Sequence, residues 1–273
     1  MNVLQALYQK IIFFNFSSSS RKNTFSPQIS ILDCETNRRV SLEQKSYIKY
    51  LGVLIDQNLS WKNHVDSVIV KISKTIGMIA KLRYFVPSTV LVNIYNSLIL
   101  PYITYGLLAW GNASNAYLNK ILVLQKRVLR LIYFTDRREH AIPLFTKAKI
   151  LPVTFLYYEA VSKLMFDVHN QSAPINILKL FTKTSHIHTY NTRSSKSQLF
   201  SIKHSRLNLQ KKAFSRVGVK IWNKIPKEFK TLSKNSFNKQ MKKSLFQILD
   251  NEDSYLDVEN ISSKLKDCII KSN

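Results

Sequence analysis

The hydrophobic pattern changes its period near Trp61, and this change constrains the fold more than any other feature of the sequence. From Val65 to Ile79, apolar residues recur three and four positions apart, which is typical of an amphipathic helix. Before Trp61 the apolar runs are short, β-prone and separated by turn-like stretches. With only 5 glycines in 273 residues, a glycine-rich β-sandwich is disfavoured. The sequence therefore predicts an α+β fold, mostly α, in which a small N-terminal β-sheet of about two to four strands precedes the helices.

The helical pattern continues along most of the chain. The first helix is expected from residue 61 to about residue 84. Further helical stretches are predicted at residues 87–101, 117–134, 153–169, 208–222 and 233–249. The inward stripe expected for the stretch 117–134 consists of Leu118, Ile121, Leu122, Gln125, Val128, Leu129 and Ile132. Residues 182–206 are polar and basic, which is typical of a long loop or linker.

The positive charge of the chain is concentrated in two windows. The chain carries 41 Lys+Arg and 16 Asp+Glu, a formal net charge of +25 at pH 7. No acidic residue lies between Ser67 and Thr135, and none lies between Val168 and Lys227. A single basic run is as often a solvent-exposed face that keeps the protein soluble as it is a binding surface. Two acid-free windows are harder to explain in that way, because a solubilising surface mixes both signs. They indicate a polyanionic partner, with nucleic acid favoured.

The candidate nucleic-acid-binding residues are basic side chains within these two windows. Those of the first window are Lys71, Lys74, Lys81, Arg83, Lys120, Lys126, Arg127 and Arg130. Those of the second window are Arg193, Lys203, Arg206, Lys211, Lys212 and Arg216. The cations near residue 130 also suit the negative end of a helix dipole, which is a purely structural reason for their presence.

The sequence contains no recognisable catalytic constellation. A glycine-rich phosphate loop, a Gly-x-Ser-x-Gly motif and a His-Glu-x-x-His motif are all missing. Asp33, Asp56 and Asp66 stand singly at turn or helix-start positions, whereas two-metal phosphoryl transfer needs several converging carboxylates. No cofactor, metal site or small-molecule substrate is therefore expected in this chain. Two distant cysteines, Cys34 and Cys268, and the lack of a signal-peptide pattern favour the nucleus or cytoplasm.

The stretch between Arg83 and Lys120 has no charged residue, so a membrane span has to be considered. Pro87, Pro101 and several polar side chains are distributed through it, and these are costly in lipid. A core helix is therefore the favoured interpretation, and an anchor at residues 90–110 is kept as a lower-ranked alternative.

Several motifs, in the same order along the chain, resemble the reverse transcriptases of non-LTR retrotransposons, the jockey-like group. They are YLGVLID (residues 50–56), LSWKNHV (59–65), IYNSLI (94–99), PYITYG (101–106), WG (110–111), LQKRVLR (124–130), YNTR (190–193) and KIWNKIP (220–226). The chain resembles the C-terminal part of the family's reverse transcriptase, which comprises the end of the palm, the thumb and the region after the thumb. It extends over nearly the whole chain, from about residue 10 to residue 249.

The resemblance implies a polymerase fragment without its active site. The family's last two catalytic carboxylates lie in a Tyr-x-Asp-Asp hairpin, and this sequence contains no such motif. We therefore expect a catalytically inactive fragment of an RNA-directed DNA polymerase of a mobile element, and not an enzyme as the chain stands. The parent polymerase would use Mg²⁺. The implied partners are RNA and DNA, as an RNA/DNA hybrid or template–primer, whose backbone a thumb binds without reading sequence.

The resemblance also suggests a division into four parts. These are a palm-end β remnant at residues 1–60, a helical thumb-like region at 61–150, a basic C-terminal helical region at 151–249 and an acidic tail at 250–273. Trp61 is assigned to the core in preference to base stacking, and Tyr105, Trp110 and Trp222 are assigned mainly to packing. The alternative function is an independent nucleic-acid-binding protein derived from a retroelement.

Overall fold

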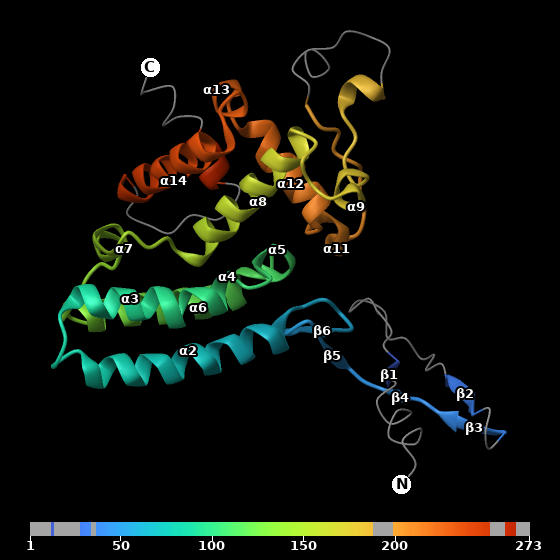
Figure 1. Cartoon of the computed structure of the whole chain (residues 1–273), viewed down its shortest axis with the longest axis horizontal. Helices are drawn as coiled ribbons and strands as arrows, with labels where there is room; N and C mark the ends of the chain where they lie inside the picture. Colours follow the sequence, from blue (N-terminus) through green and yellow to red (C-terminus); the bar gives the residue numbers. More distant parts are fainter. Residues whose placement is uncertain (1–11, 14–27, 34–36, 188–198, 252–259, 266–273) are drawn as a thin grey trace. The chain divides into compact units, whose positions relative to one another are not determined.

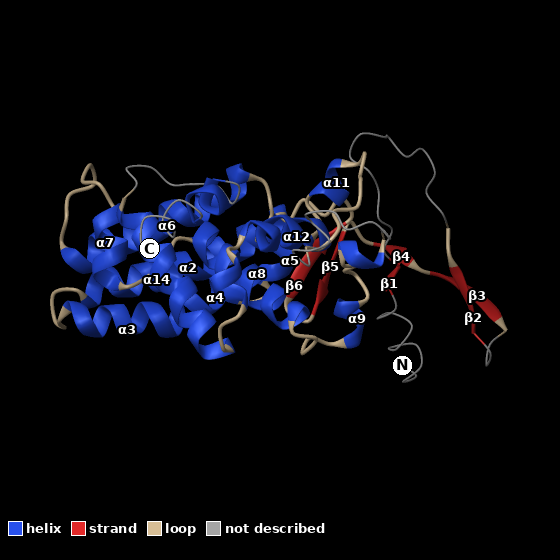
Figure 2. Ribbon diagram, turned by 90° about the horizontal axis from the view of Figure 1, so that it is seen from above, coloured by secondary structure: helices blue, strands red, loops and turns tan. Residues whose placement is uncertain are grey.

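The computed structural model of the protein describes residues 12–13, 28–33, 37–187, 199–251 and 260–265 (Figure 1). The chain divides into two compact units, Met1–Val68 and Ile69–Asn273, which are treated separately below. All six named strands precede Lys62, and the elements after that residue are helices (Figure 2). The predicted fold class, α+β and mostly α, is confirmed.

The first unit contains three short two-stranded ladders. Its strands are β1 (Ile12–Phe13), β2 (Ser30–Asp33), β3 (Arg38–Ser41), β4 (Glu43–Gln44), β5 (Tyr47–Tyr50) and β6 (Val53–Asp56). β1 pairs with β4 in parallel, whereas β2–β3 and β5–β6 are antiparallel. Among the described residues these ladders do not join into the single sheet that we expected. The strands are only two to four residues long, and the described side chains of β3 are exposed. Such strands offer little apolar surface on which a common sheet could be built.

A tight hairpin occupies residues 47–56, within the part of the chain that was predicted to contain short strands. Tyr50 pairs with Val53, and the turn between them consists of Leu51 and Gly52. Both turn residues have positive φ, 45° and 82°, as a type I′ turn requires. Leucine rarely adopts this conformation, so the sequence did not indicate the turn.

Asp56 fixes the passage from β6 into α2 (Lys62–Leu82). Its two carboxylate oxygens accept hydrogen bonds from the backbone N–H of Ser60 (2.9 Å) and of Trp61 (2.8 Å). Nearby, the imidazole Nδ1 of His64 accepts a hydrogen bond from the N–H of Leu54 (3.3 Å). Asp56 is therefore a turn-capping residue, as predicted, and two of the motifs that carry the family resemblance are used to build this connection.

The second unit consists of helices joined by short connections. They are the end of α2, α3 (Ser88–Leu98), α4 (Leu100–Thr104), α5 (Leu107–Trp110), α6 (Asn115–Tyr133), α7 (Ile142–Ala148), α8 (Val153–His169), α9 (Ile175–Leu178), the 3₁₀ turn η1 (Thr184–His186), α11 (Asn208–Lys211), α12 (Phe214–Lys224), α13 (Lys227–Lys230) and α14 (Lys234–Asp250). Residues 260–265 are also helical.

The uncharged stretch after Arg83 folds as several short helices. The predicted helix 87–101 ends at Leu98, and Pro101 lies in the first turn of the short helix α4 instead. Gly106, with φ of 62°, then separates α4 from α5. Within the described residues, no helix combines the length and the apolar character needed to cross a membrane. The predicted helix 208–222 is likewise divided, into α11 and α12.

Helix α8 is the centre of the core in the second unit. It packs against α4, α5, α6, α12 and α14. At its C-terminal half, Phe166 stacks on Phe237 of α14, with ring centroids 4.5 Å apart, and meets the ring of Trp222 edge-on. Trp110 and Trp222 are 0% and 1% exposed, so both are packing residues as expected. The expectation was wrong for Tyr105, which is 57% exposed, although its backbone carbonyl accepts a hydrogen bond from Trp110 Nε1 (2.9 Å).

A buried amide joins three helices of this core. Gln125 is fully buried, as its place in the predicted inward stripe requires, and the seven residues of that stripe are all buried. Its Nε2 donates to the hydroxyl of Tyr95 (2.8 Å) and to the carbonyl of Leu151 (3.3 Å), and its Oε1 accepts from the N–H of Val153 (2.9 Å). Burial raises the pKa of Tyr95 above its ordinary value.

Two further motifs of the resemblance also have structural roles. Gly111 lies against the ring of Tyr157 so closely that an added Cβ would overlap that ring. The side chain of Asn223 forms two hydrogen bonds with the backbone of Phe200. Its Nδ2 donates to the Phe200 carbonyl (2.8 Å), and its Oδ1 accepts from the Phe200 N–H (3.1 Å).

Candidate nucleic-acid interface

One stripe of lysines runs along the solvent side of α2. Lys71, Lys74 and Lys81 are three and seven residues apart, so they share one face of the helix. All three are exposed, whereas Ile72, Ile76 and Ile79, on the opposite side, form the buried stripe. The ammonium group of Lys71 lies 5.2 Å from the ring centroid of Tyr102 in α4. We call Lys71, Lys74 and Lys81 the α2 stripe.

The basic residues of α6 separate into two pairs. Lys120 and Arg127 are exposed and lie seven residues apart, on the side opposite the buried stripe of the helix. Lys126 and Arg130 lie on the flank and are only partly exposed. The guanidinium of Arg130 donates twice to the carbonyl of Glu139, from Nε (3.2 Å) and from Nη2 (2.7 Å), and thereby holds the loop that follows α6.

The flanking pair places two cations beside each other. Burial lowers the pKa of Lys126, and the neighbouring Arg130 cation lowers it further. Residues four apart on a helix face one another, so like charges at this spacing are mutually unfavourable.

Just after the ends of α2 and α6, Arg83 and three aromatic residues lie at neighbouring positions, and Arg83 contacts two of the rings. The Arg83 guanidinium carbon lies 3.9 Å from the ring centroid of Phe134 and 5.1 Å from that of Tyr84. The two rings are in edge contact, with centroids 5.8 Å apart. Phe85 extends from the same connection and is 83% exposed. We call Arg83, Tyr84, Phe85 and Phe134 the aromatic junction.

The residues of the second window lie on other elements. Lys203, Arg206, Lys211 and Lys212 are exposed, in the segment before α11, in α11 and just after it. Arg216 of α12 is partly buried, and its Nε and Nη1 are shielded without a hydrogen-bond partner. Arg193 lies outside the described residues, so its placement stays a prediction, as does its role and that of the other basic residues.

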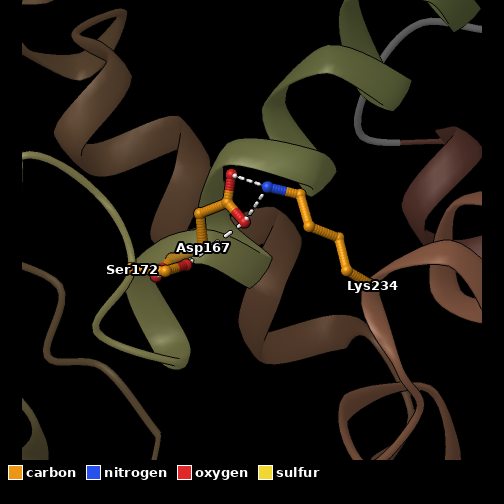
Figure 3. A network of polar contacts seen from close by, with 3 residues as sticks. All are labelled: Asp167, Ser172 and Lys234. Atoms are coloured by element: carbon orange, nitrogen blue, oxygen red, sulfur yellow. Dashed lines mark hydrogen bonds and ion pairs between the residues drawn. The ribbon is translucent and has the colours of Figure 1, made fainter.

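Most acidic side chains of the described second unit are engaged by the fold. Asp167 of α8 forms an ion pair with Lys234 at the start of α14 (2.8 Å) and receives a weak hydrogen bond from Ser172 (3.4 Å; Figure 3). Glu159 pairs with Lys163 at 2.6 Å, one helical turn away. Asp136 accepts a hydrogen bond from the backbone N–H of Arg138, and Asp250 accepts one from the hydroxyl of Thr146. In the part of the chain that the structure describes, no group of three or more His, Cys, Asp or Glu could hold a metal ion.

The aromatic part of the junction was not among the predicted site residues. Tyr84 and Phe85 follow the last residue of the amphipathic pattern, directly after Arg83 and just before Pro87. This position outside the apolar stripe is a sequence signal for exposed rings. Phe134 had been placed at the end of a helix, and only the structure shows that its ring reaches Arg83.

The chain is similar to curated polymerases of mobile elements. It is 34% identical over 100 residues to the RNA-directed DNA polymerase from mobile element jockey of Drosophila melanogaster, a match that covers 35% of this chain and 11% of the relative. It is 31% identical over 97 residues to the probable RNA-directed DNA polymerase from transposon X-element of the same organism, covering 34% and 11%. The probable polymerase from transposon BS matches at 30% identity over 115 residues, covering 40% and 12%.

These matches cover about a tenth of the length of the relatives. No protein-family model matches the chain, and no solved structure does. The resemblance seen in the sequence motifs is nevertheless confirmed by several independent relatives. Over about a third of its length, this chain is homologous to the RNA-directed DNA polymerases of jockey-like non-LTR mobile elements.

Proposed function

We propose that the helical unit of this chain binds the phosphate backbone of an RNA/DNA duplex, through the basic side chains that α2 and α6 present to solvent. The homology makes the chain reverse-transcriptase-derived. Its relatives are named as polymerases that copy RNA into DNA, so a hybrid of the two strands is the natural ligand to propose for this unit.

The single observation that carries the proposal is the pair of exposed basic stripes. Lys71, Lys74 and Lys81 on α2, with Lys120 and Arg127 on α6, are all exposed and lie opposite the buried stripes of their helices. No acidic residue lies between Ser67 and Thr135, the window that contains α6 and all of α2 after Asp66. Backbone binding needs positive charge without base-reading groups, and such surfaces supply it independently of sequence.

We also propose that this chain carries no polymerase chemistry of its own. Its sequence contains no Tyr-x-Asp-Asp motif. Asp56, which lies in one of the family motifs, uses both carboxylate oxygens to cap backbone N–H groups, and Asp167 is paired with Lys234. These contacts support a structural role for Asp56 and Asp167.

The test compares two triple variants that remove the same charge from different helices. The first variant is K71Q/K74Q/K81Q on the α2 stripe, and the second is K239Q/K242Q/K243Q on exposed positions of α14. Fluorescence anisotropy with a labelled, blunt RNA/DNA duplex measures Kd at several salt concentrations.

The α2 variant is expected to bind more weakly than wild type. The slope of log K against log salt should become less negative by about 2.7, that is, by about 0.9 for each lost phosphate contact. The α14 variant should stay close to wild type. Equal weakening of both variants would show that only net charge matters, and it would overturn the assignment to α2. An unchanged α2 variant would overturn it as well.

A further inference from the structure

The aromatic junction exposes three large rings where the two basic helices end. Tyr84, Phe85 and Phe134 are 72%, 83% and 54% exposed. Single exposed aromatic residues are ordinary, but a contiguous group of them marks an interaction site. These rings add nothing to the buried core of the unit, so their exposure needs another reason.

Arg83 contacts two of these three rings. Its guanidinium is 3.9 Å from the centroid of Phe134 and 5.1 Å from that of Tyr84, and its Nε is shielded from solvent. Tyr84 and Phe134 also contact each other edge to face. The junction is therefore a preformed surface of ring faces backed by a fixed positive charge, which costs a ligand little ordering on binding.

The backbone of Phe134 gives an independent indication. It caps the C-terminus of α6 with φ of 56° and ψ of 33°, the left-handed conformation in which glycine or asparagine is the usual residue. A bulky residue in this region is a backbone outlier, and such outliers are concentrated at functional positions. The position retains an aromatic ring that is half exposed, where glycine would fit with less strain.

The charge around the junction favours a ligand that carries phosphate groups. Lys81 lies in the last turn of α2, and Arg127 lies two turns before Phe134 on α6. Asp136, the nearest acid in sequence, accepts a hydrogen bond from a backbone N–H. Aromatic faces next to Arg and Lys are the composition of single-stranded nucleic-acid sites, where the rings stack on bases and the cations contact phosphates.

We infer that the aromatic junction stacks unpaired bases of a single strand that extends from the bound duplex. The inference rests on the proposed function, because the basic stripes that lead to the junction would hold the duplex itself. Stacking on aromatic residues tolerates any base, so the site should favour single strands without preferring a sequence.

The experiment uses four ligands: a blunt RNA/DNA duplex, the same duplex with a tail of about ten nucleotides, the same tail without bases, and the free single strand. The variants are F134G, which keeps the left-handed turn but removes the ring, and Y84L/F85L, which keeps apolar surface but removes two rings. Y105L is the control, because Tyr105 is also an exposed aromatic residue of this unit. A 2-aminopurine base in the tail reports stacking by loss of fluorescence.

Wild type and Y105L should bind the tailed duplex about tenfold more tightly than the blunt duplex and should quench the 2-aminopurine. The tail without bases should give no gain. F134G and Y84L/F85L should lose the gain and the quenching but keep the affinity for the blunt duplex, which also shows that they fold.

The inference is overturned if both ring variants keep the tail gain, or if the tail without bases is equally good. It is also overturned if the variants abolish only self-association of the protein, because the junction would then be a protein contact. Failure of the proposed function gives a different result: the blunt duplex does not bind, while the free single strand still binds and depends on Phe134.

Discussion

Replacing Gln125 with methionine should destabilise the helical unit by removing the amide that joins α3, α6 and α8. Methionine keeps the length and the apolar stem of the side chain, so the main loss is polar. The short hydrogen bonds are those to Tyr95 (2.8 Å) and Val153 (2.9 Å), and the contact with Leu151 is longer at 3.3 Å. A hydrogen bond contributes about 1 kcal/mol net, and each buried partner left unsatisfied costs about 1–3 kcal/mol. We expect a loss of about 2–4 kcal/mol in the free energy of unfolding.

Urea unfolding followed by circular dichroism measures this loss. The matched control is the same substitution at Gln240, which is exposed on α14 and should change the free energy by no more than about 0.5 kcal/mol. Adding Tyr95→Phe to Gln125→Met should cost less than the sum of the two single changes, because it removes a hydroxyl that has already lost its partner. A Gln125→Met protein as stable as the Gln240→Met control would refute the reasoning.

Four further substitutions test other parts of the structure. Gly111→Ala should lower Tm, because the new Cβ would overlap a tyrosine ring, whereas Gly77→Ala, with nothing within 4 Å, should raise it by improving helix propensity. Asp56→Ala should lose about 1–2 kcal/mol of local stability, seen as faster hydrogen exchange of the two amides that the carboxylate caps, and unchanged exchange would contradict the capping role. Burial and two nearby lysines lower the pKa of His169, so the unfolded chain binds this proton more readily, and stability is lost as pH falls below about 6.5. A His169→Phe protein should lose less stability than wild type between neutral and acidic pH, and parallel pH profiles would contradict the assignment.

Periodicity was a reliable guide where one helix face meets the core. The stripe of α6 and the bounds of α8 agree with the sequence prediction, because these helices bury a regular apolar face. The pattern failed where the backbone takes unusual conformations. The left-handed residues Leu51 and Phe134 produce a hairpin turn and a helix cap that no propensity would place there.

The candidate interface was only partly visible from charge alone. A count of basic residues could not separate the exposed Lys120 and Arg127 from Arg130, whose guanidinium is used to hold a loop. It also could not show that Arg83 lies against two aromatic rings, because its contact with Phe134 joins residues about fifty positions apart. Such contacts depend on how α2 and α6 pack, and the periodicity of each single helix carries no information on that.

The salt dependence of heteroduplex affinity tests the central claim most directly. The five exposed cations of the proposed surface, Lys71, Lys74 and Lys81 on α2 with Lys120 and Arg127 on α6, imply about five phosphate contacts and hence a slope of log K against log salt of about −4 to −5. The measurement is a titration of wild-type protein against a blunt RNA/DNA duplex between about 50 and 200 mM salt. The account predicts a linear fall with that slope. An affinity that stays flat over this range would contradict backbone binding by these helices.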